Sequence, residues 1–228
     1  MAKVKVKKQS TFIDMTAMSD VTVLLLTFFM LTSTFVKKEP ITVNTPASVS
    51  EIKVPETNSM TILVDGAGKV FFSMDNNEHL IKITQQVGTD FGISFTDKQI
   101  ESLRKIASFG VPISKLPAFL DLRGEEQDKY MQEQLLIADN TNIGIPNDSI
   151  NGQQLAMQMP NGSVKKLNEF QRWIYHARDV GGKDLLLVIK ADKTTSYEVV
   201  KSVMDDLRNL RENRYLLVTN LRTASSDK

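Results

Sequence analysis

Residues 184–221 read DLLLVIKADKTTSYEVVKSVMDDLRNLRENRYLLVTNL. The apolar run at 184–191 is typical of a strand buried on both faces. Ser196 then offers a helix N-cap, and apolar side chains recur after it at the spacing of one helix face. Residues 214–221 predict a second strand. The stretch therefore predicts a β-α-β unit whose helix packs on a sheet, within a domain of the α+β class.

Upstream residues extend this sheet. Residues 60–65 and 69–74 flank the turn Gly66-Ala67-Gly68, which is typical of a β-hairpin. Periodic apolar positions predict helices at 78–87, 97–109, 115–122, 125–137 and 164–180, the last ended by Gly181-Gly182. We therefore expect a mixed β-sheet packed by helices in a domain at 60–222, with a helix-rich insertion at 78–180 and a tail at 223–228.

Composition excludes several functions. The chain has 228 residues, a formal net charge of +1 and no cysteine. A near-zero charge gives no field for nucleic acid, so no nucleic-acid partner is expected. The lack of cysteine excludes disulfides and thiolate zinc sites. Asp205 and Asp206 point apart on a helix, and His176 fits a structural role. We expect no enzyme activity, no metal and no cofactor.

The N-terminal residues differ sharply from this average. Residues 1–12 form a basic tail with four lysines and no acid, and residues 15–36 read MTAMSDVTVLLLTFFMLTSTFV with Asp20 as the one charge. As a helix, these 22 residues span roughly 33 Å, close to the bilayer core of about 30 Å. We expect one transmembrane helix at 13–36, with the N-terminus cytoplasmic and the C-terminal domain periplasmic. Residues 37–59, with three prolines, predict an extended linker with a short edge strand at 41–44.

Two other interpretations of the apolar run remain open: a cleaved secretory signal and a buried core helix of a soluble protein. Asp20 favours a membrane function, because Thr27, Thr16 and Thr34 fall within about 40° of it on a helical wheel. Such a polar stripe needs partner helices or a water-filled path. A carboxylate there suits proton transfer, although Asp20 could instead cap a helix or bond a neighbouring one.

The sequence resembles the ExbD/TolR family of proton-channel subunits. In the segment Ile13–Val21, Asp14 takes the family's Asn/Asp position, Thr16 its threonine and Asp20 its channel aspartate, whereas Ala17 replaces the usual proline. The resemblance covers roughly 1–75 and 180–222. It also rests on VNTP at 43–46, LLLVIKAD at 185–192, YEVV at 197–200, VMD at 203–205 and LLVT at 216–219.

The resemblance implies a single-pass inner-membrane subunit of a motor driven by the proton motive force. Its partners would be a pentameric, multi-span ExbB/TolQ-like protein, a second copy of the chain and a TonB-like protein that spans the periplasm. Asp20 would carry protons, with Thr16, Thr27, Thr34 and Asp14 along their path. Open alternatives are a TolR-like subunit that binds peptidoglycan, a passive membrane-anchored binding module, and sodium as the coupling ion.

Overall fold

The computed structural model describes residues 15–33, 43, 45, 47–48, 58–137, 141–147, 154–158, 162–218 and 220–221. The chain forms two units, residues 1–36 and residues 37–228. The basic tail at 1–12, the tail at 223–228 and most of the linker at 37–59 lie outside the described residues, and so do three of the four residues of the expected edge strand at 41–44.

The described residues of the N-terminal unit, 15–33, form one helix, α1, from Thr16 to Thr32. Its 17 residues make it about 26 Å long, shorter than the bilayer core of about 30 Å. None of the helices in the described part of the chain is long and apolar enough to cross a membrane. The expectation of a single transmembrane helix at 13–36 is therefore wrong, because the described helix ends at Thr32 and the backbone of Ser33 is extended.

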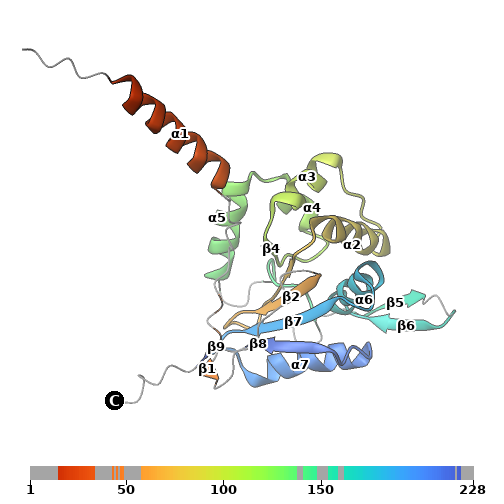
Figure 1. Cartoon of the computed structure of the whole chain (residues 1–228). Helices are drawn as coiled ribbons and strands as arrows, with labels where there is room; N and C mark the ends of the chain where they lie inside the picture. Colours follow the sequence, from red (N-terminus) through yellow and green to blue (C-terminus); the bar gives the residue numbers. More distant parts are fainter. Residues whose placement is uncertain are drawn as a thin grey trace, which may run out of the picture. The chain divides into compact units, whose positions relative to one another are not determined.

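The C-terminal unit is built on a mixed five-stranded sheet with the strand order β4-β3-β2-β7-β8 (Figure 1). The pairs β2–β3 and β3–β4 are antiparallel, whereas β2–β7 and β7–β8 are parallel. This confirms the α+β class and the mixed sheet. The strands are β2 (Ser59–Val64), β3 (Val70–Met74), β4 (Ser108–Phe109), β7 (Leu186–Ala191) and β8 (Tyr215–Val218).

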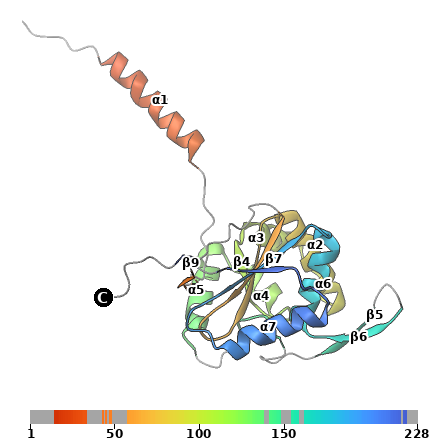
Figure 2. The same cartoon turned by 60° about the horizontal axis from the view of Figure 1, so that its bottom comes forward.

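The predicted hairpin and β-α-β unit are both present. In the β2–β3 turn, the backbone N–H of Lys69 donates to Oδ1 of Asp65 at 2.7 Å, and Gly68 has a φ of 81° that favours glycine. Burial is the largest influence on Asp65 and raises the pKa of its carboxyl. From β7, the chain passes through α7 (Tyr197–Asn209), capped by Ser196, to the parallel strand β8. Figure 2 shows α7 lying alongside this part of the sheet.

Between β3 and β7 the described residues form five helices, three of which follow the predicted positions closely. Two predictions need correction. The second expected helix, at 97–109, ends at Lys105, and Phe109 lies in β4, where the chain pairs with β3. Residues 164–167 form a strand rather than the start of a helix. The helices are α2 (Asn77–Asp90), α3 (Asp97–Lys105), α4 (Leu116–Asp121), α5 (Gly124–Leu135) and α6 (Glu169–Gly181).

Helix α6 packs its aromatic side chains on the sheet. The Phe72 ring centroid lies 5.5 Å from that of Phe170, and the Phe109 centroid lies 5.1 Å from that of Trp173. All four rings are fully buried. On β3, Phe71 contacts the backbone at Gly110 so closely that a Cβ there would lie 2.0 Å from Cδ1 of Phe71. These contacts place the core between the sheet and the long central region of the chain.

Two small sheets complete the unit. Strand β1 (Ala47–Ser48) pairs in parallel with β9 (Asn220–Leu221). Strands β5 (Leu155–Gln158) and β6 (Val164–Leu167) form an antiparallel pair. Both views show this β5–β6 pair projecting from the body of the domain (Figures 1 and 2).

Candidate functional site

Helix α1 carries the residues that the sequence singles out. None of its side chains is buried, and its large apolar side chains are exposed around the whole helix. A helix that is apolar on all sides needs apolar surroundings or partner helices to cover it. Asp20 is the one charged residue in α1. It is exposed, and no salt bridge to it is found within the described part of the chain.

Asp20 lies inside the helix and does not cap it. The N-cap is Met15, whose side chain accepts no capping hydrogen bond, and the first helical residue is Thr16. The alternative in which the helix starts later and Asp20 serves as the cap is therefore wrong. Four residues of helix precede Asp20, so its carboxylate projects from the side of α1.

The threonine hydroxyls of α1 bond to their own helix, as expected for hydroxyls in an apolar segment. Thr27 Oγ1 donates to the carbonyl oxygens of Val23 at 3.0 Å and Leu24 at 2.9 Å. The continuous helix places Thr16 and Thr27 on the face of Asp20, with Thr27 about 10 Å further along. Thr34 and Asp14 lie outside the described residues. The described polar stripe therefore runs from Thr16 to Thr27.

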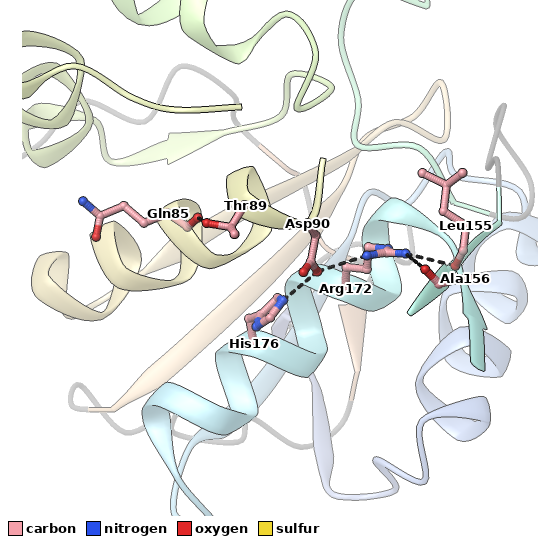
Figure 3. Close-up of polar contacts among 7 residues, drawn as sticks. All are labelled: Gln85, Thr89, Asp90, Leu155, Ala156, Arg172 and His176. Carbon is pink, nitrogen blue, oxygen red and sulfur yellow. Dashed lines mark hydrogen bonds and ion pairs between the residues drawn. The ribbon is translucent and has the colours of Figure 1, made fainter. Parts of the chain in front are cut away.

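A second polar group, which the sequence did not predict as a cluster, lies inside the C-terminal domain (Figure 3). Asp90, at the end of α2, accepts two contacts at Oδ2: Arg172 Nη1 at 3.1 Å and His176 Nε2 at 2.8 Å. Arg172 Nη2 also donates to the carbonyl oxygens of Leu155 and Ala156 in β5, at 3.0 and 3.1 Å. This Asp90 cluster ties α2, α6 and the β5–β6 pair together.

The surroundings of the Asp90 cluster point to a structural role. The Arg172 guanidinium carbon lies 5.2 Å from the centre of the Phe91 ring, a cation–π distance. Burial and the negative charges of Asp179 and Asp90 raise the pKa of the nearby Tyr175 phenol. His176, for which the sequence favours a structural role, contacts Asp90 between α6 and α2. The described residues contain no group of three or more side chains able to hold a metal ion.

A third polar group joins α6 to α7. Asp206 is 1% exposed, and its Oδ1 accepts hydrogen bonds from Asn168 Nδ2 at 3.2 Å and Gln171 Nε2 at 2.9 Å. The neighbouring Asp205 instead faces Arg208, 3.3 Å away. The two adjacent carboxylates point to different surroundings, as predicted from their helical positions, and form no acid–base pair.

Glu169 is a buried acid at the start of α6. It is 7% exposed, and its Oε1 accepts hydrogen bonds from the Ile113 backbone N–H at 2.8 Å and from Trp173 Nε1 at 3.4 Å. Burial raises its pKa to about 7, against the lowering effect of these two bonds. Sequence reasoning missed Glu169. The sequence signal that could have placed Glu169 at the start of a helix was Asn168 followed by Gln171, because these two residues form the capping box of α6.

Comparison with known families gives one match, to the N-terminal part of the chain. Residues 7–105 match the family model described as biopolymer transport protein ExbD/TolR. Residues 7–105 therefore carry an ExbD/TolR domain, which supports the resemblance seen in the sequence. Members of this family are inner-membrane subunits of motors for biopolymer transport, which work with ExbB/TolQ-like partners.

The match runs through α1, β1, β2, β3, α2 and α3. It therefore includes residues 78–105 of the segment expected as an insertion, and it stops before the C-terminal residues 180–222. No curated protein and no solved structure matches the chain.

Proposed function

We propose that this chain is the proton-carrying subunit of a motor driven by the proton motive force, and that Asp20 takes up and releases the protons. The observation that carries the proposal is the position of Asp20 in an ExbD/TolR domain. It is a single carboxylate on the side of a helix whose apolar side chains are exposed all round. We place its working contact between α1 and a multi-span, ring-forming ExbB/TolQ-like partner.

The proposed proton transfer follows from the burial of α1 among partner helices. When partner helices surround the helix, a charged carboxylate loses its water, and this transfer is costly unless the charge is paired or neutralised. Uptake of a proton removes the charge, and its release restores the charge where water or a cation is available. Asp20 would therefore be neutral against apolar partner surfaces and ionised where the path opens. Thr16 and Thr27 share its face and are proposed to line that path, with Thr34 and Asp14 at its two ends.

The energy available is sufficient for mechanical work. One elementary charge that crosses 100 mV releases about 2.3 kcal/mol, so a few protons supply enough energy to remodel a contact between proteins. We propose that two copies of the chain act together and that their C-terminal domains pass this work to a TonB-like protein. Recovery of a Pal-like protein with the complex, in place of a TonB-like one, would assign the chain to a Tol-type motor instead.

The test is Asp20→Asn, which keeps the shape of the side chain and removes the titrating proton. We expect this variant to assemble with the ring-forming partner and to lose at least about 99% of proton flux in vesicles, since the proton carrier is absent. Asp20→Glu should retain part of the flux. Asp179→Asn, an exposed position on α6, is the control and should behave as wild type. Full flux in an assembled Asp20→Asn complex would disprove the proposal.

A matched pair of threonine variants tests the path. Thr22 and Thr27 both bond to carbonyl oxygens of α1, but only Thr27 shares the face of Asp20. We expect Thr27→Val to slow proton flux several-fold and Thr22→Val to leave it unchanged. Equal effects of the two variants would show that the face of α1 is irrelevant. Flux that depends on sodium rather than on pH would identify a different coupling ion.

A further inference from the structure

Three neighbouring strands of the five-stranded sheet run in the same direction. Strand β7 lies between β2 and β8 and is parallel to both, with six residue pairs to β2 and four to β8. In chain order, β2 is the first strand of this sheet and β8 is the last. The chain therefore enters the sheet at the start of β2 and leaves it at the end of β8, which lie at opposite ends of the three parallel strands.

This topology fixes how a pull on the two ends of the sheet acts on its hydrogen bonds. A pull on the start of β2 and on the end of β8 slides these two strands in opposite directions along β7. All the hydrogen bonds of a parallel ladder then stretch at once and resist together. The β7–β8 ladder has four residue pairs against six in β2–β7, so it is the weaker of the two. A further contact that holds β8 to β7 therefore raises the force that the sheet withstands.

Arg178, in the last turn of α6, makes such a contact. Its Nη2 lies 2.6 Å from Oε2 of Glu212, in the segment that leads into β8. Its Nη1 donates to the carbonyl oxygen of Leu185, directly before β7, at 2.8 Å. The same Nη1 donates to the carbonyl oxygens of Gly182 and Lys183, at 3.3 and 3.4 Å. We call these five residues the Arg178 clamp, because they join α6 to the starts of β7 and β8.

The ion pair in the Arg178 clamp is partly buried. The side chains of Arg178 and Glu212 are 19% and 21% exposed, so solvent screens their charges less than those of an exposed pair. The start of β2 is fastened at the same end of the strands. The carbonyl oxygen of Asn58 accepts from the Leu186 backbone N–H at 3.0 Å, and its Nδ2 donates to the carbonyl oxygen of Gly181 at 3.4 Å.

We propose that the C-terminal unit transmits mechanical force between β2 and β8, and that the Arg178 clamp fastens β8 against this force. A pull on the end of β8 draws Glu212 away from Arg178, which α6 and the Leu185 carbonyl oxygen hold in place. The ion pair must therefore break before β8 slides along β7. This inference rests on the proposed function, in which the C-terminal domain passes work from the motor to another protein.

Single-molecule force measurements on the full-length chain in detergent test the clamp. The chain contains no cysteine, so handles can be attached at introduced ones. In the first geometry, Glu56→Cys and Thr223→Cys place the handles before β2 and after β8. In the second geometry, Lys98→Cys and Lys201→Cys place them at exposed positions on α3 and α7, from which the force does not run along the parallel strands.

The test variant is Glu212→Ala, because it leaves Arg178 bonded to its three carbonyl oxygens. At the same constant force, we expect it to shorten the lifetime of the folded unit about tenfold in the first geometry, since a charged hydrogen bond is lost. In the second geometry the lifetime should change by less than about twofold. Glu101→Ala is the matched control. It removes an exposed ion pair with Lys105 on α3 and should leave both lifetimes within about twofold of wild type.

Two outcomes would overturn the proposal. One is an unchanged lifetime of Glu212→Ala in the first geometry. The other is equal shortening in both geometries, which would show a general loss of stability rather than a clamp along the strands. Proton flux plays no part in these measurements, so failure of the clamp is distinguished from failure of the proton carrier, which Asp20→Asn tests.

Discussion

Glu169 shows how one buried side chain makes stability depend on pH. Its carboxyl lies in the core beside Trp173, and burial raises its pKa to about 7 from an ordinary value of 4.5. The folded domain therefore holds this proton more tightly than the unfolded chain does. The contribution to stability is complete below pH 4.5 and is lost as the pH rises through 7, an effect of about 3 kcal/mol.

Glu169→Gln removes this pH dependence. A glutamine oxygen can accept the same two hydrogen bonds from Ile113 and Trp173 without becoming charged. We expect the variant to match wild type in unfolding free energy near pH 4.5 and to exceed it by about 1–3 kcal/mol at pH 8. Trp173 is the one tryptophan in the chain and reports unfolding by its fluorescence. A wild type with the same stability as the variant at both pH values would contradict this.

At the scale of elements, the start of α6 depends both on the local sequence and on contacts with residues distant in the chain. Residues 164–167 have apolar side chains at both ends, a spacing that also fits one turn of helix, yet they pair with β5 as a strand. Asn168 then caps α6, and its side chain also donates to Asp206 of α7. The capping box is readable in the sequence, whereas the pairing with β5 depends on the fold.

Asn168→Asp separates the helix-capping role of Asn168 from its hydrogen bond to Asp206. Aspartate caps a helix as well as asparagine does, but it places a second carboxylate about 3 Å from that of Asp206. We expect the variant to be destabilised by about 2 kcal/mol or more at pH 8 and by less at pH 5, where one of the two carboxylates is neutralised more easily. Asn168→Ala, which loses the cap as well, should show little dependence on pH. Denaturant unfolding at the two pH values gives the comparison, and equal losses for Asn168→Asp at both would contradict it.

At the scale of the whole molecule, the chain consists of two units, and the buried residues of the core all lie between Met60 and Leu207. Helix α1 contributes none of them. We therefore expect a fragment of residues 37–228 to unfold cooperatively with the same midpoint as the full chain, because it keeps every buried contact. Fluorescence of Trp173 on heating measures the unfolding midpoints of the fragment and of the full chain. A clearly lower midpoint for the fragment would show that the first unit stabilises the second.

The sequence by itself determined the features that depend on neighbours along the chain. These are the β2–β3 hairpin from its turn residues, the amphipathic α7, the α+β class, and the resemblance of the N-terminal part to the ExbD/TolR family from the residues around Asp20. Each follows from local geometry or from a continuous pattern of side chains. Asp20 was identified in the same way, because a single charge in an apolar run is visible without any structure.

Only the tertiary structure decided the rest. It ended α1 at Thr32, paired Phe109 with Phe72 in the sheet, and buried Glu169 beside a backbone amide 56 positions away in sequence. It also placed α5 and the β5–β6 pair on opposite sides of the C-terminal unit (Figures 1 and 2). The physical reason is that burial, strand pairing and long-range hydrogen bonds depend on residues distant in sequence, and no local pattern specifies those partners.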